Sequence, residues 1–221
     1  MPENTLFTYK TEEDGAALYN PDHFLWKQDH KTTVDRFLTG GSPIAEKGHG
    51  WTNLTQVSSL WNRSALYFYF ECWYSCAFQS EAGDGKDSPG TLEAEMAAVL
   101  LRPEESEDYF EIMVDSYGRQ SAVHVVQPPQ VIDQEWEAAA DSRVLNSTAE
   151  KIWRAFLRLP YEPMTCAGRL TRQPDVGDAW RLNLQRVAGS GTDREFLSWR
   201  PYNPDKPDLS VFGHLVFLEA R

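Results

Sequence analysis

The fold class is decided by one strand-like stretch, Leu66-Tyr67-Phe68-Tyr69-Phe70-Glu71-Cys72-Trp73-Tyr74. Aromatic residues are enriched in β-strands, and successive side chains of a strand point to opposite faces. One face of this stretch carries only core-forming side chains, namely Leu66, Phe68, Phe70 and Cys72. The other face is mixed and carries Tyr67, Tyr69, Glu71 and Trp73. The stretch therefore predicts a strand with one face in the core.

Similar strand signals follow along the chain. They are found at residues 109–115, at 120–126 as a hairpin partner, at 181–187 and at 213–218. Residues 96–101 and 148–159 fit either a strand or a helix, and the strand-rich surroundings favour a strand for 148–159. We predict an all-β fold, a two-sheet antiparallel β-sandwich of the jelly-roll or immunoglobulin-like kind with few short helices. A single domain is expected over residues 1–221.

Composition narrows the function classes. The chain has 221 residues, of which 41% are hydrophobic and 24% charged, which is typical of a globular protein. No apolar run approaches the ~20 residues that span a bilayer. The net charge of −12 argues against nucleic acid or a membrane surface as a partner, because both attract basic proteins. Residues 81–115 hold eleven acidic residues against two basic ones.

Cysteine usage and the N-terminus suggest a cytoplasmic location. Cys72, Cys76 and Cys166 make a poor disulfide framework, so we expect Cys72 and Cys76 to be buried free thiols. The first residues show no basic region followed by an apolar one, as a secretory leader would. A secreted chain whose leader had been removed would look the same.

Motifs for phosphate, dinucleotide, zinc-protease and serine-hydrolase chemistry are absent. A glycosidase pair could come only from carboxylates brought together by folding, such as Glu95, Glu111 and Asp115. The acid-rich loops at 84–87 and 104–108 could hold calcium, although solvated charge explains them better. Aromatic residues make up 13% of the chain, and such side chains also stack on flat ligands.

Several short patterns, in a fixed order from about residue 50 to 218, together resemble the family-nine carbohydrate-binding modules and their stand-alone relatives. They are Leu60-Trp61-Asn62 with Leu66 to Glu71, Arg102-Pro103 before Tyr109 to Ile112, Leu157 to Tyr161, Trp180 to Arg186, Ser198 to Pro201, and Phe212 to Leu215. The resemblance implies a β-sandwich, often with calcium, and non-catalytic binding of polysaccharide or oligosaccharide ends in carbohydrate catabolism.

The chain departs from the family where members hold sugar between two tryptophans. The first tryptophan position is Leu92, a glutamate that contacts sugar is Ala98, and the loop at 206–211 has no aromatic residue. The acidic first position of that motif is kept as Glu95.

The resemblance and the strand alternation name candidate ligand-binding residues. Glu111 and Gln185 match positions that make polar contacts to sugar in the family, and Tyr109 shares the strand face of Glu111. Trp73 and Trp136 are candidate stacking residues. Asn183 and Trp199, with Trp180 and Arg186, match motif positions for which buried packing or hydrogen bonding is the alternative role.

Other functions remain open at this point. The chain could be a degenerate member that acts as a protein-interaction or structural domain, which predicts an exposed apolar patch at the sugar site. A haem-binding relative would need Met96 or Met113 with His124 or His214. A hydrolase would need Glu111 as a catalytic carboxylate. No metal or cofactor site is specified by spacing.

Overall fold

The computed structural model describes residues 4–28, 31–34, 36–37, 53–74, 94–103, 106–126, 131–133, 136, 138–166, 170–189, 194–203 and 208–220. The strands are β1 (Thr5–Lys10), β2 (Thr32–Val34), β3 (Arg36–Phe37), β4 (Thr55–Trp61), β5 (Ala65–Trp73), β6 (Met96–Arg102), β7 (Tyr109–Asp115), β8 (Gln120–Val126), β9 (Val131–Asp133), β10 (Asp141–Ser147), β11 (Ile152–Pro160), β12 (Ala179–Ala188), β13 (Glu195–Ser198) and β14 (Gly213–Leu218). The helices are α1 (Gly15–Leu18), α2 (Phe24–Gln28), α3 (Glu162–Cys166) and the 3₁₀ turn η4 (Leu209–Val211).

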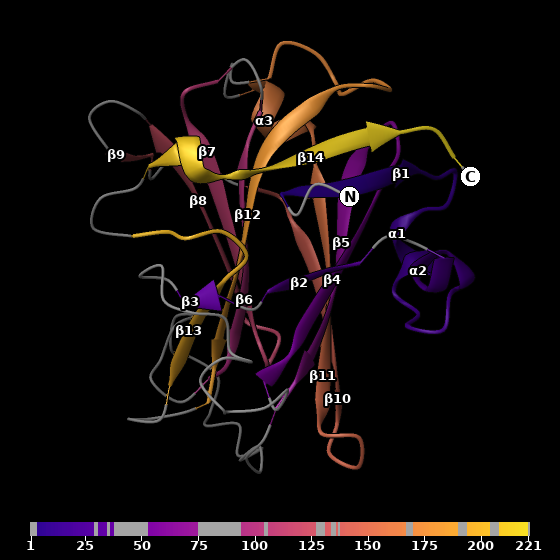
Figure 1. Cartoon of the computed structure of the whole chain (residues 1–221). Helices are drawn as coiled ribbons and strands as arrows, with labels where there is room; N and C mark the ends of the chain where they lie inside the picture. The colour runs from indigo at the N-terminus through magenta and orange to yellow at the C-terminus, as the bar shows by residue number, and fades with distance from the viewer. Residues whose placement is uncertain are drawn as a thin grey trace.

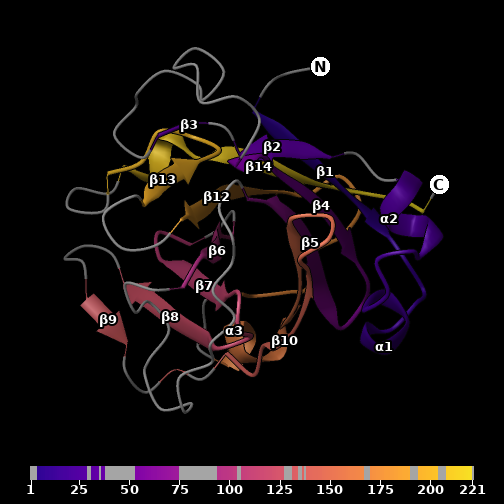
Figure 2. The ribbon, with the colours of Figure 1, turned by 90° about the horizontal axis from the view of Figure 1, so that it is seen from below.

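The strands divide into two groups that face each other across the interior. Strands β10, β11, β5 and β4 form one group, and β12, β6, β7, β8 and β9 form the other (Figure 1). Strands β1 and β14 pair with each other and connect the groups, so that the sheet bends back on itself when seen from below (Figure 2). In the described part of the chain, all fourteen strands belong to this one continuous sheet.

The strongly β fold with few short helices is confirmed, and both ambiguous segments are strands. The arrangement differs in two respects from two antiparallel sheets. The hydrogen bonding is continuous through β1, and β1 pairs in parallel with β14 and with β4. Parallel neighbours need a long connection, and nearly the whole chain separates β1 from β14. Strand alternation predicts faces, but it does not specify which strand closes the sheet.

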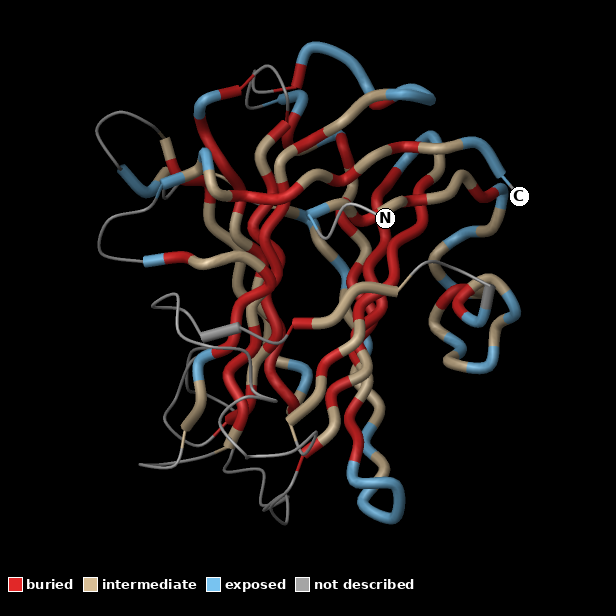
Figure 3. Tube along the Cα trace, viewed as in Figure 1, coloured by how far each residue is buried: buried red, intermediate tan, exposed pale blue. Residues whose placement is uncertain are grey.

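The two inner faces form the main core. Phe68, Phe70 and Cys72 of β5 are fully buried there, as the alternation predicted. They meet aliphatic side chains from β6, β7 and β12 on the other group. Buried segments run along both groups, whereas the tip of the β10–β11 hairpin is exposed (Figure 3). Burial raises the pKa of the Cys72 thiol to about 12, so this cysteine is unreactive. Cys76 lies outside the described residues.

Helices α1 and α2 cover the outer face of β5. Leu18 and Trp26 pack there with Tyr67, Tyr69 and Phe156 in a second, smaller core. Asp14 caps α1 by accepting from the backbone N–H groups of residues 16 and 17. The mixed face of β5 is therefore partly buried by the N-terminal segment. No helix among the described residues is long and apolar enough to cross a membrane.

A buried cluster of an ion pair and a tryptophan joins the two strand groups at one end of the core. Arg186 of β12 donates from Nη2 to Oε2 of Glu95 over 2.5 Å, and both side chains are buried. The same oxygen accepts from Nε1 of Trp153 on β11 over 2.7 Å. The guanidinium lies 4.7 Å from the centre of the Trp153 ring, within cation–π range. Oε1 of Glu95 accepts from the backbone N–H of Gly189 over 2.8 Å.

Removing one partner of this pair should destabilise the protein strongly. We expect Arg186→Met to lower the free energy of unfolding by about 3–5 kcal/mol, because Glu95 would stay buried and uncompensated. Urea unfolding followed by tryptophan fluorescence measures this loss.

The double variant Glu95→Gln/Arg186→Met is the control. It removes the buried charge, and its one amide oxygen can still accept from either Trp153 or Gly189, so it should recover part of the loss. A double variant as unstable as the sum of the two single variants would contradict the pairing.

Candidate functional site

The outer face of β12, β6, β7 and β8 brings together most of the polar residues that the sequence singled out. Cross-strand register aligns Asn183, Leu100 and Glu111 in one row. The next row contains Gln185, Ala98, Met113 and Ser121, and Ser198 of β13 extends it. Residues directly opposite in a sheet point to the same side. Glu111 and Gln185 therefore share one face, about 12 Å apart from strand spacing and rise.

Glu111 and Gln185 both keep partial exposure. Burial raises the pKa of the Glu111 carboxyl, since desolvation disfavours its charged form. Glu111 also lies near Tyr202, where burial, the Tyr109 hydroxyl and the charge of Glu111 together raise the pKa of the Tyr202 hydroxyl. The face thus carries a carboxylate in a poorly solvated setting.

Two buried polar atoms on this face lack hydrogen-bond partners among the described residues. They are Nε2 of Gln185 and Oγ of Ser121, which belong to the same cross-strand row. An unsatisfied buried donor costs about 1–3 kcal/mol. The two residues lie on β12 and β8, about 14 Å apart from strand spacing, so two separate hydroxyl groups would be needed to supply the missing partners.

Phe196 is an exposed aromatic ring on the same face, and sequence reasoning missed it. It is 47% exposed and pairs with Val187, two residues from Gln185 on β12. The Phe196 and Gln185 Cα atoms should lie about 8 Å apart. The Arg194 guanidinium lies 5.8 Å from the centre of its ring. Its strand, β13, has only four residues, so the sequence shows no alternating pattern there that would indicate a strand.

Tyr109 also lies on this face, but it is covered. It is only 1% exposed and packs edge-on against Phe212, with its hydroxyl 3.3 Å from that of Tyr202. Tyr202, Leu209, Val211 and Phe212 close this end of the face. In this structure Tyr109 offers no free ring for stacking.

Asn183 is fully buried and holds the chain that follows β13. Its Oδ1 accepts from the backbone N–H of Arg200 over 2.9 Å and from Oγ of Ser198 over 3.2 Å. Its Nδ2 donates to the carbonyl of Arg200 over 3.1 Å. Asn183 thus has the buried hydrogen-bonding role that the sequence left open as the alternative to sugar binding. Its bonds hold the residues after β13 over the outer face.

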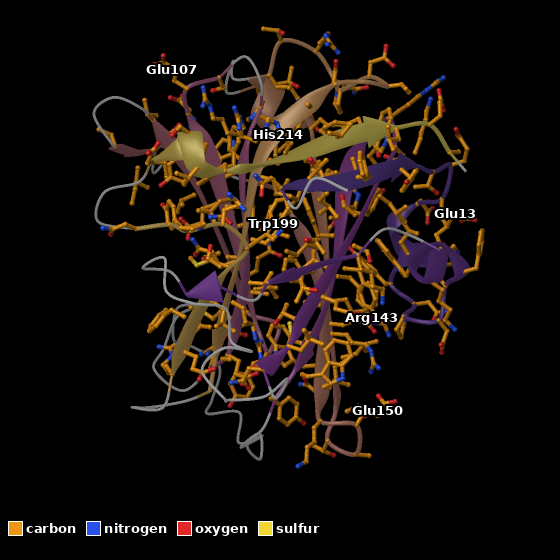
Figure 4. All side chains as sticks on the ribbon, viewed as in Figure 1. Glu13, Glu107, Arg143, Glu150, Trp199 and His214 are labelled. Atoms are coloured by element: carbon orange, nitrogen blue, oxygen red, sulfur yellow. The ribbon has the colours of Figure 1, made fainter. Side chains whose placement is uncertain are left out.

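Trp199 belongs to the inner core and is 4% exposed. Figure 4 shows it near the centre of the molecule, between the two groups of strands. A Cβ added at Gly213 would lie 2.6 Å from its ring and 2.8 Å from the carbonyl of Asn4. The close approach explains why glycine follows Phe212, and it gives Trp199 a packing role.

Trp73 and Trp136 lie away from Glu111. Trp73 points to the outer side of β5, in the opposite strand group. Trp136 packs on Phe110 and His124, with ring centroids 4.9 and 6.0 Å away, and its Nε1 donates to the carbonyl of Pro163. Neither tryptophan therefore converges with Glu111 and Gln185.

The remaining predictions concern metals and the altered family positions. Ala98 lies on the outer face beside Gln185, while Leu92, residues 206–207 and the loop 84–87 lie outside the described residues. Among the described residues, no group of three or more His, Cys, Asp and Glu side chains could hold a metal ion. Both ring nitrogens of the buried His124 face carboxylates, Nδ1 at 3.1 Å from Asp133 and Nε2 at 3.2 Å from Asp108.

Solved structures with the same architecture cover nearly the entire chain. A protein of Bacteroides uniformis for which carbohydrate binding is proposed superposes with a TM-score of 0.67 at 14% identity, covering 97% of this chain and 99% of its own. A family-nine carbohydrate-binding module of Caldicellulosiruptor kristjanssonii in complex with cellotriose superposes with a TM-score of 0.64 at 11% identity. The match covers 98% of this chain and 95% of the module. A family-nine module from the same organism in complex with glucose superposes with a TM-score of 0.63 at 11% identity. The match covers 98% of this chain and 97% of the module.

This chain has the fold of the family-nine carbohydrate-binding modules. A scan against protein-family models finds no match. A search of curated proteins finds no relative either. The likeness thus rests on architecture, which is conserved here at identities too low to carry over individual residues.

The carboxyl groups of Glu111 and Glu150 should affect stability with opposite signs. Because the pKa of the Glu111 carboxyl is raised in the folded state, protonated Glu111 favours folding. This contribution to stability is fully present below the pKa of the unfolded chain, near 4.5, and is lost as pH rises through the pKa of the folded protein. We expect Glu111→Gln to stabilise the protein at pH 7, with a gain that shrinks towards pH 4. Urea unfolding at both pH values measures this.

Glu150→Gln is the matched control. Hydrogen bonds from Arg154 lower the pKa of Glu150, so its stabilisation is present above the unfolded pKa and disappears as pH falls through the folded one. That variant should be less stable at pH 7 and equal to the parent in strong acid. The same sign for both variants at pH 7 would contradict the electrostatic assignment.

Proposed function

We propose that this chain is a non-catalytic carbohydrate-binding protein and that the outer face of β12, β6 and β7 holds the sugar. The observation that carries the proposal is the convergence of Glu111, Gln185, Ser121 and Phe196 on that face. The fold shared with sugar-binding modules supports it. Poly- or oligosaccharide recognition within carbohydrate catabolism is the biological setting we propose.

The polar groups suit hydroxyls spread along an oligosaccharide, because Glu111 and Gln185 lie about 12 Å apart. Glu111 accepts hydrogen bonds as a carboxylate, and bonds to a charged group are stronger than those between neutral groups. The amide of Gln185 donates from Nε2 and accepts at Oε1. Ser121 does both through one hydroxyl. Donors and acceptors thus occur on the same face, which matches a ligand whose every hydroxyl is both.

Phe196 supplies the apolar platform that the missing tryptophans would provide. A sugar ring presents C–H groups on one face, and an exposed aromatic ring packs against them with little loss of conformational freedom. Phe196 lies next to Gln185, so one pyranose ring can contact both. Asn183, Tyr109 and Trp199 hold this surface in shape from beneath or beside it.

The interaction-domain alternative is less well supported. It predicts a contiguous apolar patch at this face. Among the described residues on this side, the large hydrophobic side chains with high exposure are Phe196 of β13 and Ile132 of β9. They lie at opposite edges of the strand group and so form no contiguous patch. A polar surface with a single exposed ring is more typical of a small-ligand site.

Binding to neutral oligosaccharides tests the proposal. Cellotriose, xylotriose and glucose should be titrated against the protein by isothermal calorimetry. We expect Gln185→Ala and Phe196→Ala each to weaken binding about 10-fold or more, which corresponds to roughly 1–3 kcal/mol for a hydrogen bond or a stacked ring.

Phe24→Ala is the matched control, because Phe24 is also an exposed ring, 55% accessible, on α2. It should leave the affinity unchanged. If the parent protein binds no oligosaccharide at millimolar concentration, or if Phe24→Ala and Phe196→Ala lose affinity equally, the outer face is not a sugar site.

A further inference from the structure

A cavity of about 410 Å³ opens on the opposite side of the molecule from Glu111. Its walls come from α2 and the turn before it, from β5, and from the β10–β11 hairpin, whose tip carries Glu150 (Figure 4). Tyr69 and Glu71 line it from the outer face of β5, while Phe70 between them points into the core. The full thickness of the core therefore separates this cavity from the Glu111 face.

The floor of the cavity is rigid and aromatic. The rings of Trp26 and Tyr69 lie 5.3 Å apart, and each is 2% exposed. Trp26 is held by a hydrogen bond from Nε1 to the carbonyl of Leu18 over 2.9 Å. Burial, with the charge of Glu71, raises the pKa of the Tyr69 hydroxyl, so this group remains protonated at neutral pH. The cavity is thus preformed.

The charged lining residues balance one another. Lys27 pairs with Asp22 over 3.1 Å, and Arg154 pairs with Glu150 over 2.9 Å. Lys31 pairs with Glu71. Three cations and three carboxylates line the cavity, so its net charge is zero. A charged ligand would have to compete with one of these pairs. The chain's charge of −12 also disfavours an anion.

Arg154 leaves one strong donor unused. Its Nε is buried and has no hydrogen-bond partner among the described residues. The nearest carboxylate oxygen, Oε1 of Glu71, lies 3.9 Å away, which is too far for a direct hydrogen bond. A hydroxyl oxygen placed between them would reach both at normal distances. It would accept from Nε and donate to Glu71, as a bridging water does.

We propose that this cavity is a second ligand site, for a neutral polyhydroxylated molecule the size of a mono- or disaccharide. Its volume lies at the small end of ligand pockets, which run from about 300 to 1,000 Å³. Hydroxyls satisfy carboxylates and cations alike without breaking the ion pairs. Trp73 lies on the same outer face of β5, one alternation beyond Glu71, and is partly exposed. The site does not depend on sugar binding at the Glu111 face.

The Arg154 Nε–H resonance is a direct probe of this site. It can be assigned in ¹H–¹⁵N spectra by its loss in Arg154→Lys. Glucose, xylose and cellobiose should each be titrated into the full chain up to ~50 mM, which detects dissociation constants in the millimolar range. We expect a saturable shift of this resonance with at least one of these sugars. Glu71→Gln should weaken that response about 10-fold, since a hydrogen bond to a charged acceptor is stronger than one to a neutral amide.

Two comparisons separate this inference from the proposed function. The shift should persist in Phe196→Ala, even where that variant loses binding on the other face. Glucuronate and glucosamine test the ligand class, and they should shift the resonance less than glucose. The inference is overturned if all three neutral sugars leave the resonance unmoved, if only the charged sugars move it, or if Phe196→Ala abolishes the shift. Calorimetry in the Phe196→Ala background gives a second readout, and an unchanged sugar affinity on adding Arg154→Lys would also overturn the inference.

Discussion

The contact between Glu95, Arg186 and Trp153 is the interaction on which the two-layered arrangement depends. It joins β12 to β11 across the interior, at the end of the core far from the β1–β14 connection. A buried charge is costly unless it is paired and hydrogen-bonded, so each partner requires the others in place. The bent sheet is thereby closed at one end by backbone pairing and at the other by side chains.

Once the inner faces are closed on each other, the two outer faces are left with different environments. The N-terminal helices cover the β5 and β11 side, and they leave a polar cavity where Arg154 and Glu71 meet the edge of α2. On the other side, the segment held by Asn183 covers one end of the sheet around Tyr109. The uncovered part retains Glu111, Gln185 and Phe196. The protein therefore offers polar surfaces on two sides of one core.

The comparison with sugar-binding modules concerns the fold, and these two surfaces are where a ligand could bind. At 11–14% identity the shared property is the fold, and function has to be argued from side chains. The sequence resemblance assigns the family's stacking tryptophans to Leu92 and to the loop at 206–211, which has no aromatic residue. The exposed ring on the outer face is Phe196. Three tryptophans among the described residues serve the interior: Trp153 in the ion-pair cluster, Trp26 under α2, and Trp199 against Gly213.

Much of the fold could be read from local pattern, because alternation along a strand depends only on backbone geometry. The sequence alone predicted the buried face of β5, the β7–β8 hairpin, and the placement of Glu111 and Gln185 as outward polar residues. It could not place Trp73, Trp136 or Trp199, since alternation says which face of a strand a residue occupies but not which layer the strand joins. The continuous sheet through β1, the exposure of Phe196 and the cavity at Arg154 were decided by tertiary structure. Each depends on segments far apart in the chain meeting through packing that no local window contains.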